Sequence, residues 1–112
     1  LITVNVMEFI KKDKFTILVP DSVEELPEAI QENYKRESYQ NLVLDISEAS
    51  AISDIISDYL ETLAEEYLDE KKSLVAVVKT ELMKELDGII VAVPTISEAA
   101  DYVYMEELER EL

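Results

Sequence analysis

Asp45 and the serines behind it are the residues whose types and spacing most invite chemistry. The stretch 42–54, LVLDISEASAISD, places an aspartate at the end of an apolar run, followed by a serine-rich turn. A carboxylate at the end of a parallel strand can accept a phosphoryl group. It then needs nearby acids that hold Mg²⁺ and a lysine that pairs with the phosphoryl oxygens. The sequence therefore raises the hypothesis of phosphoryl transfer at Asp45.

The groups that would complete such a site are partly missing. Asp21 supplies one acid after the first long apolar run, and Thr80 follows a later one. The ending LVPDSVEE lacks the adjacent acidic pair of a receiver domain. The last apolar run ends VAVPTI without lysine, and Lys79 belongs to a different run. A phospho-receiver-like domain that uses Asp45 is therefore the alternative, and the favoured interpretation is a strand-end turn of Asp45 and Ser47, in which the aspartate holds backbone N–H groups.

Three serines behind this turn, Ser50, Ser53 and Ser57, offer hydroxyl groups but no base to activate them. The sequence contains no histidine, and no serine has the Ser-x-x-Lys spacing that activation by lysine would need. Ser53 instead suits the N-cap of the following helix, and Asp54 would interact favourably with the positive end of the helix dipole. The function that competes with this capping role is regulatory phosphorylation or partner docking at the helix start.

Composition narrows the function further. The 112 residues include 10 Lys and Arg against 26 Asp and Glu, a formal net charge of −16. This charge repels phosphate backbones and anionic lipids, so we expect neither nucleic-acid nor membrane-surface binding. It suits either solubility or a basic protein partner. The absence of Cys and His removes thiolate nucleophiles, the usual zinc ligands and the commonest general base, so we expect no enzyme, no metal site and no cofactor.

The apolar runs are too short to cross a membrane, for which roughly 18 residues are needed. The opening LITVNV is also too short for the apolar region of a signal peptide and has no basic flank. We therefore predict a cytoplasmic protein. Met7 is a candidate initiator, which would make Leu1 to Val6 an upstream leader.

Short apolar runs rich in Val, Ile and Leu predict buried strands at 15–20, 41–46, 73–78 and 88–94. A weaker edge strand at 4–10 would pair with the first of them as a hairpin across 11–14. Helical periodicity predicts helices at 22–36, 54–68 and 80–86 and a last helix beginning at Thr95. Strands that alternate with helices imply parallel pairing through right-handed crossovers. The chain is therefore predicted to be one small α/β domain over 1–112, with a mixed sheet.

Two residue pairs have the spacing of a capping box. Ser22 with Glu25 precedes the first helix, although Pro27 suits the first turn of a helix better than the second. Thr95 with Glu98 precedes the last helix. The middle helix is the most strongly patterned, with one apolar stripe of Ile56, Leu60, Leu63 and Tyr67.

The order of these elements resembles the STAS domain, the fold of anti-sigma-factor antagonists and of transporter regulatory tails. The segment 41–63, NLVLDISEASAISDIISDYLETL, resembles the family's strand ending in Asp-Leu-Ser, its turn, and the Asp-Ser-x-Gly that opens a helix. KKSLVAVV resembles the following strand, and VPTISEAADYV resembles the last junction between strand and helix. The closing segment 93–112 is similar to the tail of small STAS-like proteins of Bacteroidetes. The resemblance implies a mixed, mostly parallel sheet of about five strands with helices packed mainly on one side.

The resemblance also implies a regulatory site, because a cognate kinase phosphorylates the serine of the Asp-Ser-x-Gly turn in STAS antagonists. With Asp45 aligned, Ser53 stands at the family's aspartate and Asp54 at its phosphorylated serine. Ile55 and Ile56 take the next two positions, so the glycine is absent. Either the switch is lost and a constitutive binding module survives, which we favour, or Ser53 has taken over the role in a register shifted by one residue.

The sequence therefore predicts a non-enzymatic module that binds another bacterial protein, with an anti-sigma-type regulator as a candidate. The predicted contact surface is the turn and helix start that contain Ser50, Ser53, Asp54, Ile55 and Ser57. The alternatives are the phospho-receiver and a structural or accessory domain. A homodimer is compatible with each of them.

Overall fold

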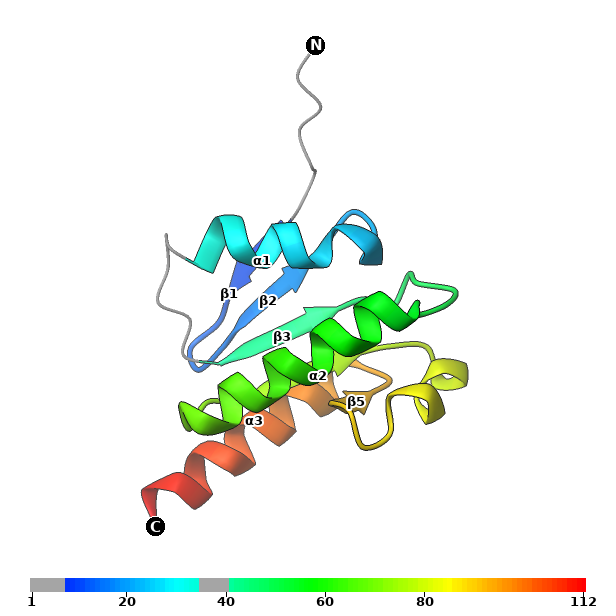
Figure 1. Ribbon diagram of the computed structural model, residues 1–112. Helices are drawn as coiled ribbons and strands as arrows, with labels where there is room; N and C mark the ends of the chain where they lie inside the picture. Colours follow the sequence, from blue (N-terminus) through cyan, green and yellow to red (C-terminus); the bar gives the residue numbers. More distant parts are fainter. Residues whose placement is uncertain (1–7, 35–40) are drawn as a thin grey trace.

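A computed structural model describes residues 8–34 and 41–112 of the chain (Figure 1). Five strands form one sheet in the order β1-β2-β3-β4-β5. They are β1 (Glu8–Lys11), β2 (Thr16–Val19), β3 (Leu42–Asp45), β4 (Leu74–Val77) and β5 (Val91–Val93). β1 pairs antiparallel with β2, and the remaining pairs are parallel. The predicted mixed, mostly parallel sheet is confirmed, and so is its hairpin. The part of the predicted edge strand before residue 8 lies outside the described residues.

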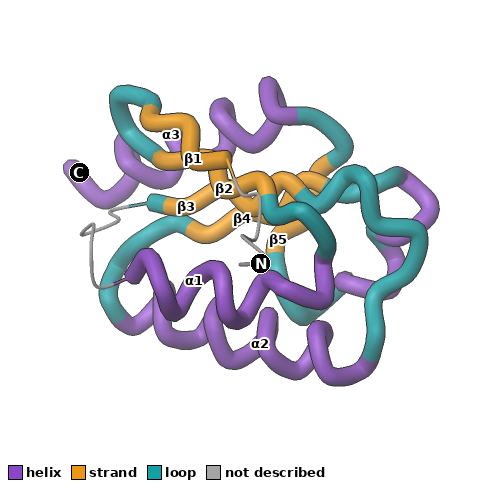
Figure 2. Tube along the Cα trace, turned by 90° about the horizontal axis from the view of Figure 1, so that it is seen from above, coloured by secondary structure: helices purple, strands orange, loops and turns teal. Residues whose placement is uncertain are grey.

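Helices cover both faces of the sheet, but unequally (Figure 2). α1 (Leu26–Tyr34) and α2 (Asp54–Asp69) lie on one face, and α3 (Ile96–Glu111) lies on the other. Each crossover from one parallel strand to the next is expected to be right-handed, and β2, β3 and β4 follow one another across the sheet. This order puts α1 and α2 on the same side. The predicted packing of helices mainly on one side is confirmed.

The buried side chains form two clusters, one on each face of the sheet. The larger cluster of buried side chains joins α1 and α2 to alternate residues of the strands, such as Leu18, Leu44 and Ala76. The smaller cluster joins Ala99 and Val103 of α3 to the residues that point the other way. This alternation across the sheet explains why the strand sequences are almost continuously apolar: both faces are covered.

α2 agrees closely with its prediction. Ile56, Leu60, Leu63 and Tyr67 are its buried residues, which confirms the predicted stripe. α3 begins as predicted: Thr95 Oγ1 accepts a hydrogen bond from the Glu98 N–H at 3.1 Å. Neither of these helices, nor any other in the described ranges, is long and apolar enough to cross a membrane.

The predicted helix at 22–36 is wrong at its start, and its last two residues, 35 and 36, lie outside the described residues. Ser22 makes no side-chain capping bond, and Val23–Glu25 form a 3₁₀ turn before α1 begins at Leu26. The cause is Pro27, which has no N–H to donate to Val23 and therefore fits only the first turn of an α-helix. The prediction that Pro27 belongs in a first turn is thereby confirmed.

The predicted helix at 80–86 consists instead of two 3₁₀ turns, Thr80–Leu82 and Lys84–Leu86. They bury Leu82 and Leu86 against the larger cluster. So few residues cannot repay the cost of helix nucleation through hydrogen bonds alone, so packing selects the tighter turns. Gly88, with φ of +80°, then turns the chain into β5, which is shorter than the run predicted at 88–94.

Candidate functional site

Asp45 holds the turn at the carboxyl end of β3. Its Oδ1 accepts hydrogen bonds from the Ser47 N–H at 3.2 Å and from the Ser47 hydroxyl at 2.6 Å. A further backbone bond from the Ala49 N–H to the Ile46 carbonyl closes the turn. The predicted strand-end turn of Asp45 and Ser47 is confirmed. Its hydrogen bonds are short-range, and they fix the direction in which the chain leaves the sheet.

Ser53 is the N-cap of α2, as predicted. Its Oγ accepts a bond from the Ile56 N–H at 3.3 Å, and its carbonyl accepts one from the Ser57 N–H at 2.9 Å. Asp54 is exposed in the first turn of the helix, where a negative charge interacts favourably with the helix dipole. Both ends of the segment between β3 and α2 are therefore held by side-chain bonds.

A cavity of about 300 Å³ lies beside this segment, at the carboxyl ends of β2 and β3. Its lining residues include Asp21, Asp45, Ser47 and Glu48. Among the residues that the structure describes, no lysine or arginine lines the cavity, so this part of the chain provides no side chain to pair with a phosphoryl group there. The strand order also does not reverse at this edge, and reversal is what opens a ligand crevice in parallel sheets. The phospho-receiver alternative stays a prediction. Asp21 and Asp45 support it, but no lysine or arginine among the described lining residues does.

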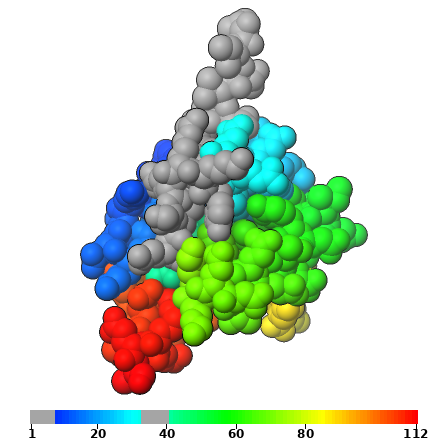
Figure 3. All heavy atoms as spheres, turned by 60° about the vertical axis from the view of Figure 1, so that its left-hand side comes forward, coloured from blue at the N-terminus to red at the C-terminus, as the bar shows by residue number. Residues whose placement is uncertain are grey.

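The helix start itself presents an apolar side chain to solvent. Ile55 is 77% exposed, whereas its neighbour Ile56 is buried in the core. Ser50 is exposed in the connecting loop, and Ser57 is half-buried. Figure 3 shows α2 and the loop before it as a broad green surface of the molecule. Ser53, Asp54, Ile55 and Ser57 are thus gathered at one end of α2, with Ser50 in the segment that leads to it.

Comparison with known proteins adds no family. No protein-family model matches the chain, and no curated protein matches it.

A polar network that sequence analysis missed lies at the opposite end of the sheet. Asn41 and Ser73, each 1% exposed, directly precede β3 and β4, and the register pairs Leu42 with Leu74. The Asn41 Oδ1 accepts a bond from the Ser73 N–H at 2.7 Å, and its Nδ2 donates to the Lys14 carbonyl at 2.8 Å. The signal in the sequence was a polar residue at the first position of each of two successive predicted strands, 41–46 and 73–78.

The network continues into the second half of α3. Asn41 Nδ2 donates to the Glu107 carboxylate at 2.7 Å, and the Ser73 hydroxyl donates to Glu106 at 2.5 Å. Arg110 donates to the Ser73 hydroxyl at 3.1 Å and to Glu107 at 2.9 Å. Ala99 and Val103 are the buried residues of α3, and both lie in its first half. The network therefore attaches the second half of this helix.

The network is built for attachment rather than for proton transfer. Burial, followed by a hydrogen bond to Glu106, raises the pKa of Tyr102 to about 12. Hydrogen bonds from Asn41 and Arg110 lower the pKa of Glu107 below its ordinary value. Near pH 7 the tyrosine therefore stays protonated and the carboxylate stays ionised. A general acid or base needs a pKa near the working pH, and neither group has one.

Replacing Glu107 by glutamine should destabilise the protein at neutral pH but not in acid. The folded pKa of Glu107 lies below its ordinary value of 4.5, so its contribution is complete above that pH and is lost as the pH falls through the folded pKa. We expect a loss of about 1 kcal/mol at pH 7, since bonds to a charged group are weakened. Thermal unfolding from pH 7 to pH 3, with exposed Glu111→Gln as the control, checks this. A difference from wild type that persists unchanged at pH 3 would contradict it.

Proposed function

We propose that this chain is a non-enzymatic, STAS-like module that binds another protein through the start of α2 and the loop before it. The observation that carries the proposal is the exposure of Ile55, at 77%, at a position where the backbone is held on both sides. A large apolar side chain on a pre-organised surface is the kind of group around which binding energy concentrates. The exposed Ser50 and Asp54 would form part of the polar rim.

The order of elements also supports the STAS-like assignment. A hairpin is followed by parallel strands, with α2 beginning directly after the β3 turn, as in the segment that carries the resemblance. The absence of Cys and His from the sequence favours binding over catalysis, and so does the absence of lysine and arginine from the described residues that line the β3 cavity. The partner class that this proposal names is an anti-sigma-type regulator, and the proposed compartment is the cytoplasm.

Asp54 supports the constitutive form of the module over the switched form. It is exposed in the first turn of α2, at the position where STAS antagonists carry the phosphorylated serine, and it already supplies a negative charge there. The Ser53 hydroxyl is engaged as the helix cap. A kinase is therefore not needed to place charge at this surface, and we propose that binding does not depend on phosphorylation.

Ile55→Lys should remove partner binding and leave the fold intact. The side chain is solvent-exposed, so its replacement should cost at most a few tenths of a kcal/mol of stability. A lysine at the centre of an apolar contact should weaken binding by about tenfold or more. The matched control is Leu108→Lys, which places the same charge at a 61% exposed leucine of α3.

The measurement is affinity capture from a lysate of the source cells with wild type, Ile55→Lys and Leu108→Lys as parallel baits. It is followed by the dissociation constant of any purified partner. We expect a protein retained by wild type and by the Leu108 variant but lost with the Ile55 variant. Equal retention by all three baits would move the contact surface away from the start of α2. Phosphate found on Ser53 of the bait would instead support the switched form.

A further inference from the structure

The sheet has one edge without the usual protection against strand addition. β1 forms one edge and carries the charged residues Glu8 and Lys11, which discourage pairing with another chain. The opposite edge is β5, whose three residues are Val, Ala and Val. Within the described ranges, β5 pairs on one side alone, with β4. Its outer side therefore presents backbone groups next to apolar side chains.

The register identifies these backbone groups. Val91 is opposite Val75 and Val93 is opposite Val77, and the Val93 carbonyl accepts a bond from the Val78 N–H at 3.0 Å. Successive residues of a parallel strand turn their N–H and C=O to opposite sides, so Val91 and Val93 bond to β4. The N–H and C=O of Ala92 consequently face the open edge. Pro94 follows without an N–H, which limits any added pairing to a short stretch.

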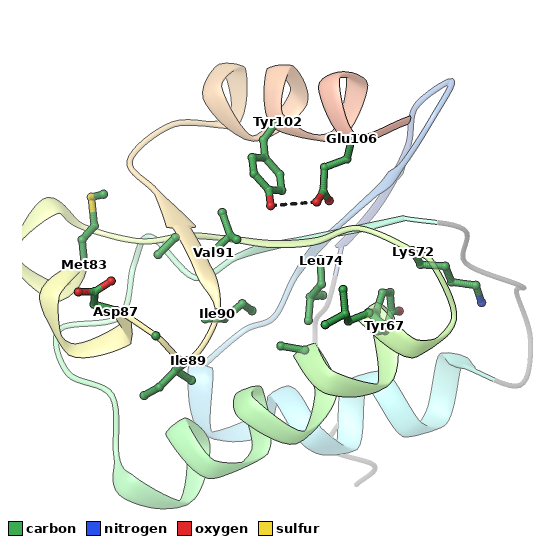
Figure 4. A pocket seen from close by; sticks show the side chains of 14 residues that line it. Tyr67, Lys72, Leu74, Met83, Asp87, Ile89, Ile90, Val91, Tyr102 and Glu106 are labelled. Carbon is green, nitrogen blue, oxygen red and sulfur yellow. Dashed lines mark hydrogen bonds between the residues drawn. The ribbon is translucent and has the colours of Figure 1, made fainter. Parts of the chain in front are cut away.

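A groove of about 550 Å³ lies beside the first two residues of β5 (Figure 4). Tyr67 and the 75% exposed Leu68 line it from α2, while Tyr102 and Glu106 line it from α3. Its floor is the edge of the sheet at Val91 and its neighbours. The groove therefore lies between the two helix layers and reaches the open edge of the sheet at Val91 and Ala92, where a short added strand would begin. Apolar surface is available on both walls for the alternating side chains of such a strand.

The charge of the two helices beside the groove indicates what kind of segment would fit. α2 contains six acidic residues and no Lys or Arg, and α3 contains six acidic residues and one Arg. Lys72, at the end of the groove, is already paired with Glu70 at 3.2 Å. A second copy of this chain would bring the same acidic helices together across a two-fold axis. A segment with basic flanks would instead be attracted by the acidic residues of the two helices and by the net charge of −16 of the chain.

We propose that the β5 groove binds an extended segment of another protein as a short sixth strand, with apolar side chains at alternate positions and Lys or Arg on its flanks. Two backbone hydrogen bonds at Ala92 hold the segment in register. Contacts with Leu68, Val91 and Tyr102 supply the apolar burial. This surface is distinct from the start of α2, so the inference does not rest on the proposed function.

The test uses a synthetic peptide in which valine alternates with threonine between flanking lysine pairs, and a matched peptide with glutamate in place of lysine. Binding is measured by fluorescence anisotropy, and protection of the Ala92 amide by hydrogen exchange. We expect the lysine peptide to bind, to protect this amide and to weaken with added salt. The glutamate peptide should not bind. A lysine peptide that fails to bind, or that binds without protecting Ala92, would overturn the proposal.

Two variants and one control locate the binding. Ala92→Pro removes the outward N–H without removing a bond to β4, and Leu68→Ala removes apolar surface that is exposed in the free protein. Each should weaken binding of the lysine peptide by about tenfold, the effect of one lost hydrogen bond or buried contact. Ile55→Lys should leave it unchanged. Equal binding by all variants would overturn the proposal, as would concentration-dependent dimerisation that protects Ala92 without peptide. If Ala92→Pro does not fold, Leu68→Ala decides alone.

Discussion

Leu60→Ala is expected to lower the free energy of unfolding by about 3 kcal/mol. Leu60 lies on the inner side of α2 and is completely buried in the cluster that joins α1, α2 and the sheet. Truncation removes its burial and leaves a cavity that the flanking strands cannot fill without moving. Urea denaturation followed by circular dichroism measures the change. The slope of the transition should stay that of wild type, because the extent of the folded structure is unchanged.

Leu68→Ala is the matched control, because the same substitution is made in the same helix. Both variants gain the same small helix propensity, and they differ in burial, since Leu68 is 75% exposed. We expect Leu68→Ala to change stability by less than about 0.5 kcal/mol. Equal losses in the two variants would contradict the orientation of α2 on the sheet. The Leu68 result also shows whether this variant is fit for the peptide experiment.

The orientation of α2 could be predicted from sequence because its signal is long. Its apolar stripe runs from Ile56 to Tyr67 in a helix of sixteen residues, and one stripe of that length fits a single arrangement against a sheet. The strands could be predicted equally well, because short continuous runs of Val, Ile and Leu bounded by polar turns are typical of parallel strands that are covered on both faces. The order of the elements then implied the mixed sheet and the side of the sheet that α1 and α2 cover.

The errors lie where competing local effects nearly balance. The pair of Ser22 and Glu25 has capping-box spacing, but Pro27 moves the start of α1 to Leu26 and leaves Ser22 without a capping bond. The segment 80–86 has helical spacing, yet it is too short to form an α-helix and follows the shape of the core instead. In both places the spacing of residues predicted a helical feature. The proline prevented it in the first segment, and the short length of the segment prevented it in the second.

The candidate site divides in the same way between local and distant contacts. Asp45 bonds Ser47 two residues away and Ser53 bonds Ile56 three residues away, so both roles could be predicted from spacing. The β5 groove combines residues of α2, β5 and α3, which no local pattern connects. The exposure of Ile55 next to the buried Ile56 depends on the rotation of α2 about its axis, which the stripe determines.

The network around Asn41 could not be predicted from the spacing of residues, because its members are far apart in the chain. Asn41 is 32 residues from Ser73 and 66 from Glu107, and its side chain joins the amino ends of two strands to α3. Neither Asn41 nor Ser73 is accessible to water, so each of their polar groups depends on a partner within the protein. Together with the edge contact between the Tyr104 and Phe15 rings, the network therefore attaches the second half of α3, which has no buried apolar side chain.

Asn41→Ala should accordingly destabilise the protein by about 3 kcal/mol, nearly as much as the loss of a core leucine. The substitution leaves the buried Ser73 N–H without its acceptor and deprives Glu107 of a donor. Gln31→Ala, at an exposed amide of α1, is the control and should change little. Both variants are compared with wild type by urea denaturation at pH 7.

A double-mutant cycle then shows whether the network acts as one unit. Arg110→Ala alone should cost less than Asn41→Ala, because Arg110 donates to the network from its more accessible side. The two losses should sum to more than the loss in the double variant by about 1 kcal/mol, since both variants disturb Ser73 and Glu107. Strict additivity would mean that Asn41 orders the strand ends alone, and that the second half of α3 is attached by other contacts.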